Sequence, residues 1–290
     1  MFLQQLVNGL TIGGIYAMVA LGYSMVYGVL QIVNWAHADV LMVGTFIGLI
    51  FVTKLNMPVI VMVLLAAAAT AIIGITVERV AYRPIQSSNR RMAVLVSALG
   101  MSVFLQNLAQ LIFGSSTKAF PTIEKVPYTL GSVSFTNIQI IIGIITIMML
   151  TILYIMVYKS KMGVAMRACS VSIPNAKLMG INTNAIISIT FGLGTFMAGI
   201  AGICIGTYYN AVYPTMGYML GMKAFSAAIL GGIGSIPGAV VGGFLIGIIE
   251  SLGSGYLSSG YRDAYAFIIM IVILVLRPSG IMGAKHVDKV

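Results

Sequence analysis

Long stretches without a charged residue most constrain what this chain can fold into. Five of them approach or exceed the roughly 20 residues that a helix needs to cross a bilayer: 6–33, 59–77, 92–113, 138–158 and 185–207. Only 8% of the residues are charged, whereas a soluble domain carries about 25%. A soluble fold is therefore excluded, and the sequence predicts an integral membrane protein.

Four further apolar stretches are shorter or carry a charge: 38–52, 218–233, 239–252 and 261–276. At 1.5 Å per residue, a run of about 14 residues covers roughly 21 Å, less than the roughly 30 Å hydrocarbon core. We therefore expect some of these segments to be half-spans. The predicted fold is all-α, a single polytopic membrane helix bundle over residues 1–290 with about eight or nine transmembrane or re-entrant helices.

The net charge of +10 first suggests a nucleic-acid partner, but the positions of the basic residues argue against one. Eleven Lys and Arg fall in three segments on one side of the predicted bundle, and only four fall in the segments between. The first group is Arg79, Arg83, Arg90, Arg91, Lys159, Lys161, Arg167, Lys177, Arg277, Lys285 and Lys289, and the second is Lys54, Lys118, Lys125 and Arg262. Basic residues in short loops stay in the cytoplasm. We expect no nucleic acid but a lipid bilayer around the chain, a multi-pass protein of the bacterial inner membrane and a cytoplasmic C-terminus.

The side of the N-terminus stays open, because the first 53 residues contain no Lys or Arg. If 6–33 and 38–52 are both full spans, Met1 lies outside. If one of them is re-entrant, Met1 lies inside.

Many of the 33 glycines lie inside the apolar stretches at small-xxx-small spacing. Such spacing lets two helix backbones approach closely, which is how helices associate in lipid. The candidate packing pairs are Gly44 with Gly48, Gly202 with Gly206, Gly217 with Gly221, and Gly243 with Gly247. We expect them to pack within this chain, with a subunit interface as the alternative.

Two apolar segments, 43–50 and 242–249, resemble each other, and each follows an interruption. The first interruption is Asn34-Trp-Ala-His-Ala-Asp39, and the second is Gly232-Ile-Gly-Ser-Ile-Pro-Gly238. Paired, broken, short helices in two halves indicate a transport pathway. The candidate pathway or gate residues are Asn34, His37, Asp39, Gly232, Gly234 and Ser235. The alternative is that Asn34, His37 and Asp39 only cap a helix at the cytoplasmic surface.

Asp39 and Glu250 are acids inside apolar stretches. A charge at mid-bilayer costs about 3 kcal/mol, so both should face protein, water or an interface. We expect Lys223 to extend toward the outer surface, and Arg262 with Asp263 to form an adjacent interfacial pair. So few acids and histidines argue against an ion-driven carrier.

No sequence pattern points to catalysis or to a cofactor. Cys169 and Cys204 lack metal-site spacing, and no G-x-x-x-x-G-K-[ST] occurs, so the chain cannot hold nucleotide phosphates in the P-loop manner. We expect no enzyme activity, no catalytic residue, no metal and no bound cofactor. If transport is active, the energy comes from a partner.

The largest predicted cytoplasmic segment spans about 159–184. Pro174 suits the first turn of a helix, and Gly180 or Asn182 can end one, so a short helix is expected over about 173–179. Its apolar and basic side chains favour a docking site for another protein, with a helix lying on the bilayer as the alternative. The candidate docking residues are Pro174, Asn175, Ala176, Lys177, Leu178, Met179 and Gly180.

The chain resembles a known family over nearly its whole length. The stretches that carry the likeness are 17–29, 34–39, 78–84, 179–182, 221–239 and 277–282, with Gly221-Met-Lys-Ala-Phe-Ser-Ala-Ala-Ile-Leu-Gly-Gly-Ile-Gly-Ser-Ile-Pro-Gly-Ala239 the most specific. They resemble the smaller permease subunits of high-affinity branched-chain amino acid importers of the ATP-binding-cassette (ABC) type. Related subunits serve urea, short amides or other amino acids.

The resemblance implies several partners: a second homologous permease, two cytosolic ABC ATPases and an extracytoplasmic substrate-binding protein docking near 115–136 and 208–217. It also implies that 159–184 is the coupling loop, with a degenerate E-A-A-x-x-x-G motif. There Pro174 replaces Glu and Asn175 replaces the first Ala, whereas Ala176 and Gly180 fit.

The sequence thus predicts a translocation subunit for branched-chain or related amino acids, with selectivity set mostly by the binding protein. The alternative is a self-sufficient secondary carrier or facilitator for a small neutral solute such as urea or an amide.

Overall fold

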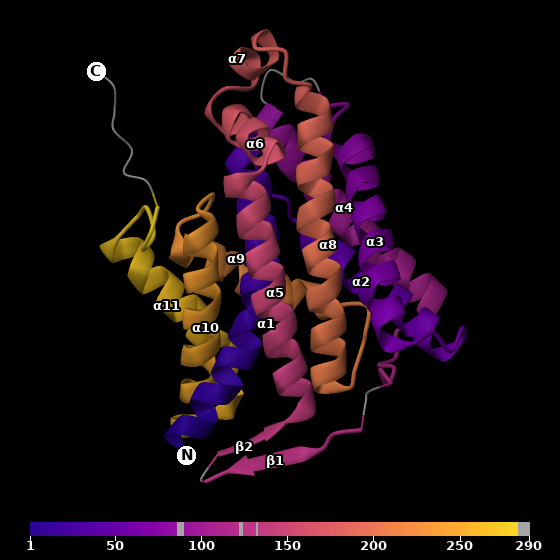
Figure 1. Ribbon diagram of the computed structural model, residues 1–290, viewed down its shortest axis with the longest axis vertical. Helices are drawn as coiled ribbons and strands as arrows, with labels where there is room; N and C mark the ends of the chain where they lie inside the picture. The colour runs from indigo at the N-terminus through magenta and orange to yellow at the C-terminus, as the bar shows by residue number, and fades with distance from the viewer. Residues whose placement is uncertain (86–89, 122–123, 132, 284–290) are drawn as a thin grey trace.

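The computed structural model describes residues 1–85, 90–121, 124–131 and 133–283, and they form a helix bundle (Figure 1). The longer helices are α1 (Phe2–Leu30), α3 (Val59–Val77), α4 (Arg90–Phe113), α5 (Asn137–Lys159), α8 (Thr183–Tyr209) and α10 (Ile236–Tyr256). The shorter ones are α2 (His37–Thr53), α6 (Lys161–Val171), α7 (Ile173–Leu178), α9 (Met216–Gly231) and α11 (Arg262–Leu276), with a π-helical turn η1 (Glu78–Tyr82) and a 3-10 turn η2 (Ser259–Tyr261). The predicted all-α membrane bundle is confirmed.

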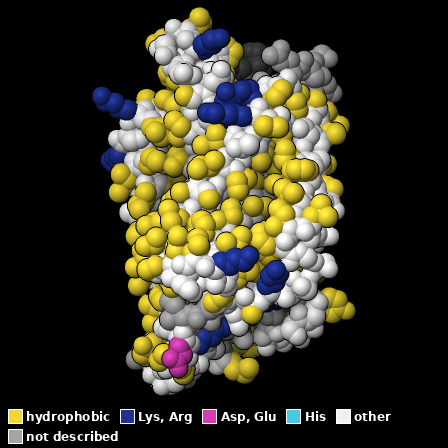
Figure 2. Space-filling model, turned by 90° about the vertical axis from the view of Figure 1, so that its right-hand side faces the viewer, with side chains coloured by type: hydrophobic (Ala, Val, Ile, Leu, Met, Phe, Trp, Pro, Cys, Tyr) yellow, Lys and Arg dark blue, Asp and Glu magenta, His cyan; other side chains and the backbone are white. Residues whose placement is uncertain are grey.

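Among the described residues, seven helical segments are long and apolar enough to cross a membrane. Of these, α1 and α8 are almost wholly buried, whereas α3, α4, α5 and α11 expose most of their apolar side chains. Such a rim is stable only against lipid, since in water it would be an aggregation surface. Figure 2 shows the resulting band of hydrophobic side chains, with Lys and Arg toward both ends of the molecule.

Glycines bring the first helix against a helix near the end of the chain. A Cβ added at Gly9 would lie 2.7 Å from the Cα of Ile248, and one at Gly13 would lie 2.9 Å from the Cα of Phe244. From α10, a Cβ at Gly243 would lie 2.5 Å from the Cα of Ala17. The α1 and α10 backbones therefore touch, and this contact ties residues far apart in sequence into one bundle.

The two short helices α2 and α9 begin inside the bundle. Their first turns meet, since Gly217 packs against the Ala38 carbonyl and Gly221 against the Ala38 side chain. His37, at the start of α2, packs on Gly22, about 12 Å from the end of α1 at 1.5 Å per residue. With 17 and 16 residues, these helices span about 25 Å each, less than the roughly 30 Å hydrocarbon core. That some of the short segments are half-spans stays a prediction.

The other two segments that looked short form longer helical segments. Helix α10 has 21 residues, because it continues through the polar and small residues that end the apolar stretch 239–252. Helix α11 continues from η2, and together they give 18 residues, Ser259–Leu276.

The bundle has two distinct ends (Figure 1). Helices α6 and α7 lie at one end, called here the α7 end. A two-stranded antiparallel hairpin, β1 (Pro127–Leu130) and β2 (Val133–Thr136), lies at the other, the hairpin end, with Tyr128 opposite Phe135. The Gln4 side chain donates to the Ser134 carbonyl (2.7 Å) and accepts from the Ser134 N–H (2.8 Å). The N-terminus is therefore at the hairpin end, whereas the described chain ends at Gly283 against Gly232, near the α7 end.

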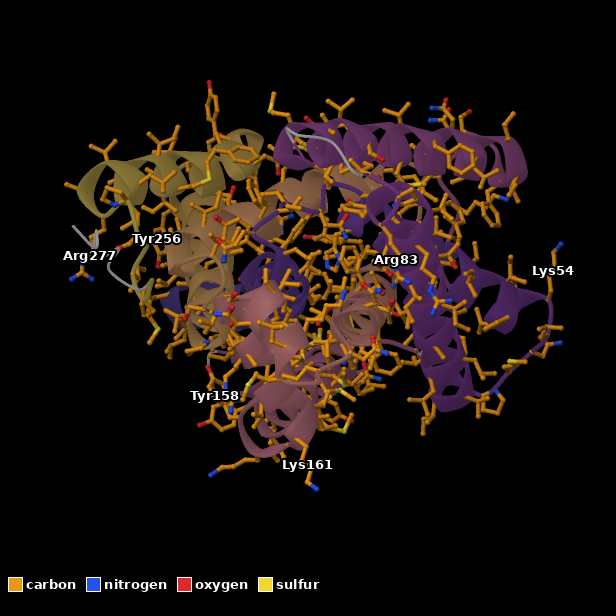
Figure 3. All side chains as sticks on the ribbon, turned by 90° about the horizontal axis from the view of Figure 1, so that it is seen from above. Lys54, Arg83, Tyr158, Lys161, Tyr256 and Arg277 are labelled. Carbon is orange, nitrogen blue, oxygen red and sulfur yellow. The ribbon has the colours of Figure 1, made fainter. Side chains whose placement is uncertain are left out.

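The N-terminus and Gly283, the last described residue, thus lie toward opposite ends of the bundle. Two of the eleven basic residues predicted to be cytoplasmic, Lys285 and Lys289, lie outside the described residues. Seen from the α7 end, Lys161 and Arg277 project from the rim, as does Lys54 of the far end, whereas Arg83 lies within the outline of the bundle (Figure 3).

Candidate functional site

The segment after α6 forms the short helix that the sequence predicts. Ser172 caps α7, its Oγ accepting a hydrogen bond from the Asn175 N–H (3.3 Å), and Pro174 occupies the first turn. Such a proline has a preset φ and no N–H to leave unsatisfied. The predicted range, 173–179, is one residue longer than the observed helix.

Gly180 ends this helix in a left-handed conformation, with φ +81°. The Gly180 N–H donates to the Lys177 carbonyl and the Ile181 N–H to the Ala176 carbonyl, both at 3.1 Å. This pair of bonds is the Schellman arrangement. Asn182, the other candidate for this role, instead caps the next helix, α8, by accepting from the Ala185 N–H (3.1 Å).

Helix α7 presents an apolar knob away from the bundle. The side chains of Leu178 and Met179 are 85% and 82% exposed, next to the exposed Lys177, whereas Ala176 is buried. Val171, at the end of α6, is exposed on the same part of the molecule. Pro174 and Asn175 are also exposed, so the predicted docking residues other than Ala176 are accessible.

At the first interruption, the structure buries Asn34, His37 and Asp39 within the bundle. The Tyr82 hydroxyl donates to Asn34 Oδ1 (2.5 Å), and the Gln106 side chain donates to Asp39 Oδ1 (2.9 Å). None of the three caps α2 through its side chain, and α2 starts below the surface. The capping alternative is wrong, because the chain turns back into the bundle before α2 begins.

Asp39 lines a cavity of about 270 Å3 between α1, α2, α4 and α9. Its walls include Tyr23, Trp35, Ser102 and Tyr218. His37 lies behind Tyr23, with ring centroids 4.7 Å apart, and neither of its ring nitrogens has a hydrogen-bond partner among the described residues.

The second interruption lies elsewhere, near the α7 end. Gly232 (φ +106°) and Gly234 (φ +89°) adopt conformations that favour glycine, and Ser235 caps α10 by accepting from the Gly238 N–H (3.2 Å). Gly234 lines a small cavity, about 70 Å3, together with Met166 and Arg167 of α6. The structure therefore separates the two predicted gate clusters and places the second beside the helix that precedes α7.

Six of the predicted packing glycines contact helices of this same chain. Gly44 packs on Thr70, Gly48 on Ile203, and Gly202 and Gly206 on Thr45, while Gly243 and Gly247 meet Ala17 and Gly13 of α1. Each of these glycines therefore has a packing partner within the chain.

A cluster of four charged side chains lies near the hairpin end, and the sequence reading of it is wrong in two places. Lys223 is buried and pairs with Glu250 (Nζ to Oε1, 3.1 Å) and Asp263 (Nζ to Oδ1, 2.6 Å). It does not extend to the surface, because α10 and α11 cover the second turn of α9 and bring acids within its reach.

Arg262 and Asp263 likewise do not pair with each other in the described structure. Arg262 Nε donates to Glu250 Oε1 (2.5 Å) and Nη2 donates to the Tyr209 hydroxyl (2.5 Å). Consecutive helical residues point in different directions, so each reaches a partner on another helix. The Tyr16 hydroxyl donates to Glu250 Oε2 (2.9 Å) and completes the cluster.

This cluster contains the functional candidates that sequence reasoning missed. A usable signal existed: Lys223 and Glu250 each interrupt an otherwise apolar segment, and intramembrane charges pair with one another. Tyr16 and Tyr209 carry no such signal, since tyrosine also occurs on lipid-facing and interfacial surfaces.

A helix bundle with an apolar rim, two short helices that meet inside it, buried charges and an exposed apolar helix at one end has the architecture of a polytopic membrane protein. The family model of "branched-chain amino acid transport system / permease component" matches residues 5–276. The chain belongs to this family, whose members are translocation components and not enzymes.

Similar proteins cover the full chain. The high-affinity branched-chain amino acid transport system permease protein LivH of Escherichia coli K12 is 43% identical over 100% of this chain and 98% of its own length. The corresponding protein BraD of Pseudomonas aeruginosa is 42% identical with the same coverage. The solved structure of PsaBC from Streptococcus pneumoniae in complex with Fab is 13% identical and has a TM-score of 0.52 over 96% of this chain and 93% of that one; it supports the fold alone.

Proposed function

We propose that this chain is the membrane subunit through which an ATP-driven importer moves branched-chain amino acids into a bacterial cell. The substrate class comes from the full-length similarity to permeases of branched-chain amino acid transport. The structural observation that most supports the role is α7, a capped helix that holds Leu178 and Met179 exposed at one end of the bundle. The self-sufficient carrier is not favoured by membership of a permease-component family.

In this proposal α7 is the coupling helix. A cytosolic ATPase binds the knob of Val171, Lys177, Leu178 and Met179, and its movement on ATP binding is passed through α6 to the bundle. Gly234 and α6 line the same small cavity, which gives that movement a path to the second interruption. This chain binds no cofactor, and ATP is used by two partner ATPases.

The other proposed partners are a second homologous permease and an extracytoplasmic substrate-binding protein. The binding protein would dock at the hairpin end, where segments 115–136 and 208–217 lie together: the Lys118 N–H donates to the Val212 carbonyl at 2.9 Å, and the reverse bond has the same length. The ATPases and the binding protein would then act at opposite ends of the bundle.

We place the α7 end in the cytoplasm of a cell with the chain in its inner membrane. Arg79, Lys159, Lys161, Arg167 and Lys177 all belong to segments at this end, and basic residues are retained on the cytoplasmic side. The N-terminus would then be outside and the C-terminus inside.

The proposed gate is the cavity beside Asp39, where the first turns of α2 and α9 meet. A small shift between two short helices that begin inside the bundle changes this cavity without breaking a full span. Gly217 and Gly221 allow the close contact with Ala38 on which such a shift depends.

Reconstitution into proteoliposomes tests the proposal. The complete set, namely both permeases, the ATPases and the leucine-loaded binding protein, should accumulate L-leucine only with ATP, and leaving out any one component should stop uptake. ATP-independent leucine or urea equilibration by this chain alone would contradict the proposal and support the facilitator.

Sidedness has its own test. Leu178→Cys, in a chain whose Cys169 and Cys204 are replaced by Ser, should react with an impermeant maleimide in inside-out vesicles and not in right-side-out ones. Assembly with the ATPases should protect it. Lys54→Cys, on an exposed residue of the opposite end, should show the reverse sidedness and no protection.

A further inference from the structure

Near the hairpin end, a cavity of about 370 Å3 opens between α1, α8, α9 and α11. One side of its wall is charged, with Lys223, Arg262 and Asp263. The other side is aliphatic, and it is formed by Ile205, Met216, Met219 and Leu220. A volume of this order lies in the range of small-molecule sites, which combine an apolar lining with a few placed polar groups.

The charges at this cavity sum to zero. Two bases, Lys223 and Arg262, face two acids, Glu250 and Asp263, and three ion pairs join all four. Glu250 and Lys223 are buried, so their mutual pairing is obligatory. A ligand with a net charge would unbalance the cluster in a poorly solvated place, whereas a neutral or zwitterionic ligand would not.

Two of the four charged groups, Arg262 and Asp263, line the cavity and have side-chain atoms that can still form hydrogen bonds. The side chains of Arg262 and Asp263 are 32% and 51% exposed. Within the described part of the chain, Arg262 uses Nε and Nη2 but makes no hydrogen bond through Nη1, and Asp263 uses Oδ1 but accepts none at Oδ2. The cavity thus offers one cationic donor and one anionic acceptor on adjacent residues.

We propose that this cavity is a binding site for a zwitterionic aliphatic amino acid on its way through the permease. The ligand's α-carboxylate binds Arg262, its α-ammonium binds Asp263, and its side chain packs against Met216, Met219 and Leu220. The assignment rests on the proposed function for the class of substrate, and it adds a site within this chain to the selectivity of the binding protein.

The position of the cavity fits a receiving site. Tyr209 and Arg262 are at the ends of α8 and α11 that lie toward the hairpin end. Tyr16 lines this cavity and Tyr23 lines the cavity beside Asp39, two turns further along α1. Both cavities also border the first two turns of α9, so a substrate leaving the first site toward the α7 end meets the proposed gate next.

Saturation-transfer difference NMR on the full chain in lipid nanodiscs tests the site. L-leucine should give a signal that is strongest at its methyl protons. Two analogues, 4-methylpentanoate without the ammonium and isoamylamine without the carboxylate, should bind about tenfold more weakly or worse, since each loses a charged hydrogen bond.

Two charge variants should each weaken a different set of ligands, a pattern that a purely structural ion-pair cluster would not give. Asp263→Asn should weaken leucine about tenfold and leave 4-methylpentanoate unchanged, and Arg262→Gln should weaken leucine while leaving isoamylamine unchanged. Lys54→Gln, which neutralises one exposed charge at the same end, should change none of them. Equal losses for all ligands in both variants would overturn the site and leave the cluster as a brace between α9, α10 and α11.

A further variant covers the case in which a charge variant does not fold. Met219→Trp keeps every ion pair and fills the aliphatic side, so it should weaken leucine about tenfold and leave glycine unchanged. An unchanged leucine-to-glycine ratio would overturn the site.

A leucine signal absent from the unmodified chain, while the assembled transporter imports leucine, would also overturn the site and leave the proposed function intact. No leucine import by the assembled transporter would overturn the proposed function instead.

Discussion

Arg83 donates two parallel hydrogen bonds to Glu78, which lies five residues earlier in the chain. Nε donates to Oε1 and Nη2 to Oε2, each at 3.0 Å. In a regular α-helix, residues five apart point about 140° away from each other. Here the π-helical turn η1, with the Arg83 N–H bonded to the Glu78 carbonyl (2.9 Å), aligns them on one face.

Ser188 of α8 joins this pair and makes it a link between helices. Its hydroxyl donates to Glu78 Oε2 (2.8 Å) and accepts from Arg83 Nη2 (2.7 Å). Glu78 is buried, whereas the Arg83 side chain is 38% exposed. Losing Arg83 therefore leaves a buried carboxylate without its charge partner, while losing Glu78 leaves a guanidinium that water can reach.

We expect Arg83→Gln to lower the free energy of unfolding by about 1.5–3 kcal/mol and Glu78→Gln to lower it by less. Thermal unfolding in detergent, followed by circular dichroism, measures both. Arg79→Gln, which removes another base of the same turn, is the control and should change little. The opposite ranking of Arg83→Gln and Glu78→Gln would contradict the asymmetry.

The contact of Gly22 with His37 gives a second prediction. A Cβ at residue 22 would meet the imidazole, with Cε1 at 2.5 Å, and the Gly194 carbonyl oxygen at 3.0 Å. Gly22→Ala should therefore push His37 and the start of α2 away, at a cost of about 1–3 kcal/mol, and reduce uptake. Thermal unfolding and leucine uptake of the assembled transporter measure the two effects.

His37→Ala should partly rescue Gly22→Ala, since a smaller side chain leaves room for the added methyl, though not at the Gly194 carbonyl. Gly143→Ala on α5 is a matched control, because a Cβ there meets nothing within 4 Å. Additive losses in the double variant would show that the ring is not the obstacle.

Asp39 at the proposed gate gives a third prediction. Asp39→Asn keeps the size of the side chain and an acceptor for Gln106 but removes the negative charge from the cavity wall. If that charge helps the substrate pass, the rate of leucine uptake should fall several-fold while the amount of inserted protein stays the same. Full uptake would leave Asp39 with a structural role only.

Features that depend on residues close in sequence could be predicted, whereas contacts between helices far apart in sequence could not. Ser172, Pro174 and Gly180 each act within a few residues, so the bounds and the exposed side chains of α7 follow from the sequence. Asp39 and Glu250 are buried, as expected for acids that face protein, water or an interface rather than lipid, because the cost of a charge in lipid holds whatever the partner is.

The errors share one cause. The partners of Lys223 and Arg262 are on other helices, and no local pattern says which helices pack together. The hairpin at Pro127–Thr136 was missed for a similar reason, since it is held against α1 by the contact of Ser134 with Gln4, which no local pattern indicates. The depth of α2 was set by a glycine, Gly22, on a different helix.

Cys169 on α6 gives a prediction about reactivity. It is 1% exposed, and burial raises the pKa of its thiol. Only the thiolate reacts, so at pH 7 the side chain should be labelled by maleimide about tenfold more slowly than an exposed cysteine, and its rate should still be rising with pH where that of an ordinary thiol has levelled off. The matched control is Ser170→Cys in a Cys169→Ser chain, one residue further along and exposed. Equal rates would mean that α6 opens readily.

The last prediction concerns the residue that ends α7. A Cβ at Gly180 would meet nothing within 4 Å, so the space around the residue does not require glycine. The backbone does, because its φ of +81° is left-handed. A β-branched residue there costs about 1–2 kcal/mol, which is comparable to the contribution of the two C-terminal hydrogen bonds, about 0.5–1.5 kcal/mol each. Gly180→Val should therefore displace Leu178 and Met179 while the spans stay inserted. Leucine uptake per ATP hydrolysed should fall several-fold, measured as tritiated leucine against released phosphate in the same proteoliposomes.

Gly180→Asn is the matched control, because asparagine adopts the left-handed conformation more easily, and it should keep most of the coupling. Loss of coupling in both variants to the same extent, or in neither, would contradict the role of this helix end.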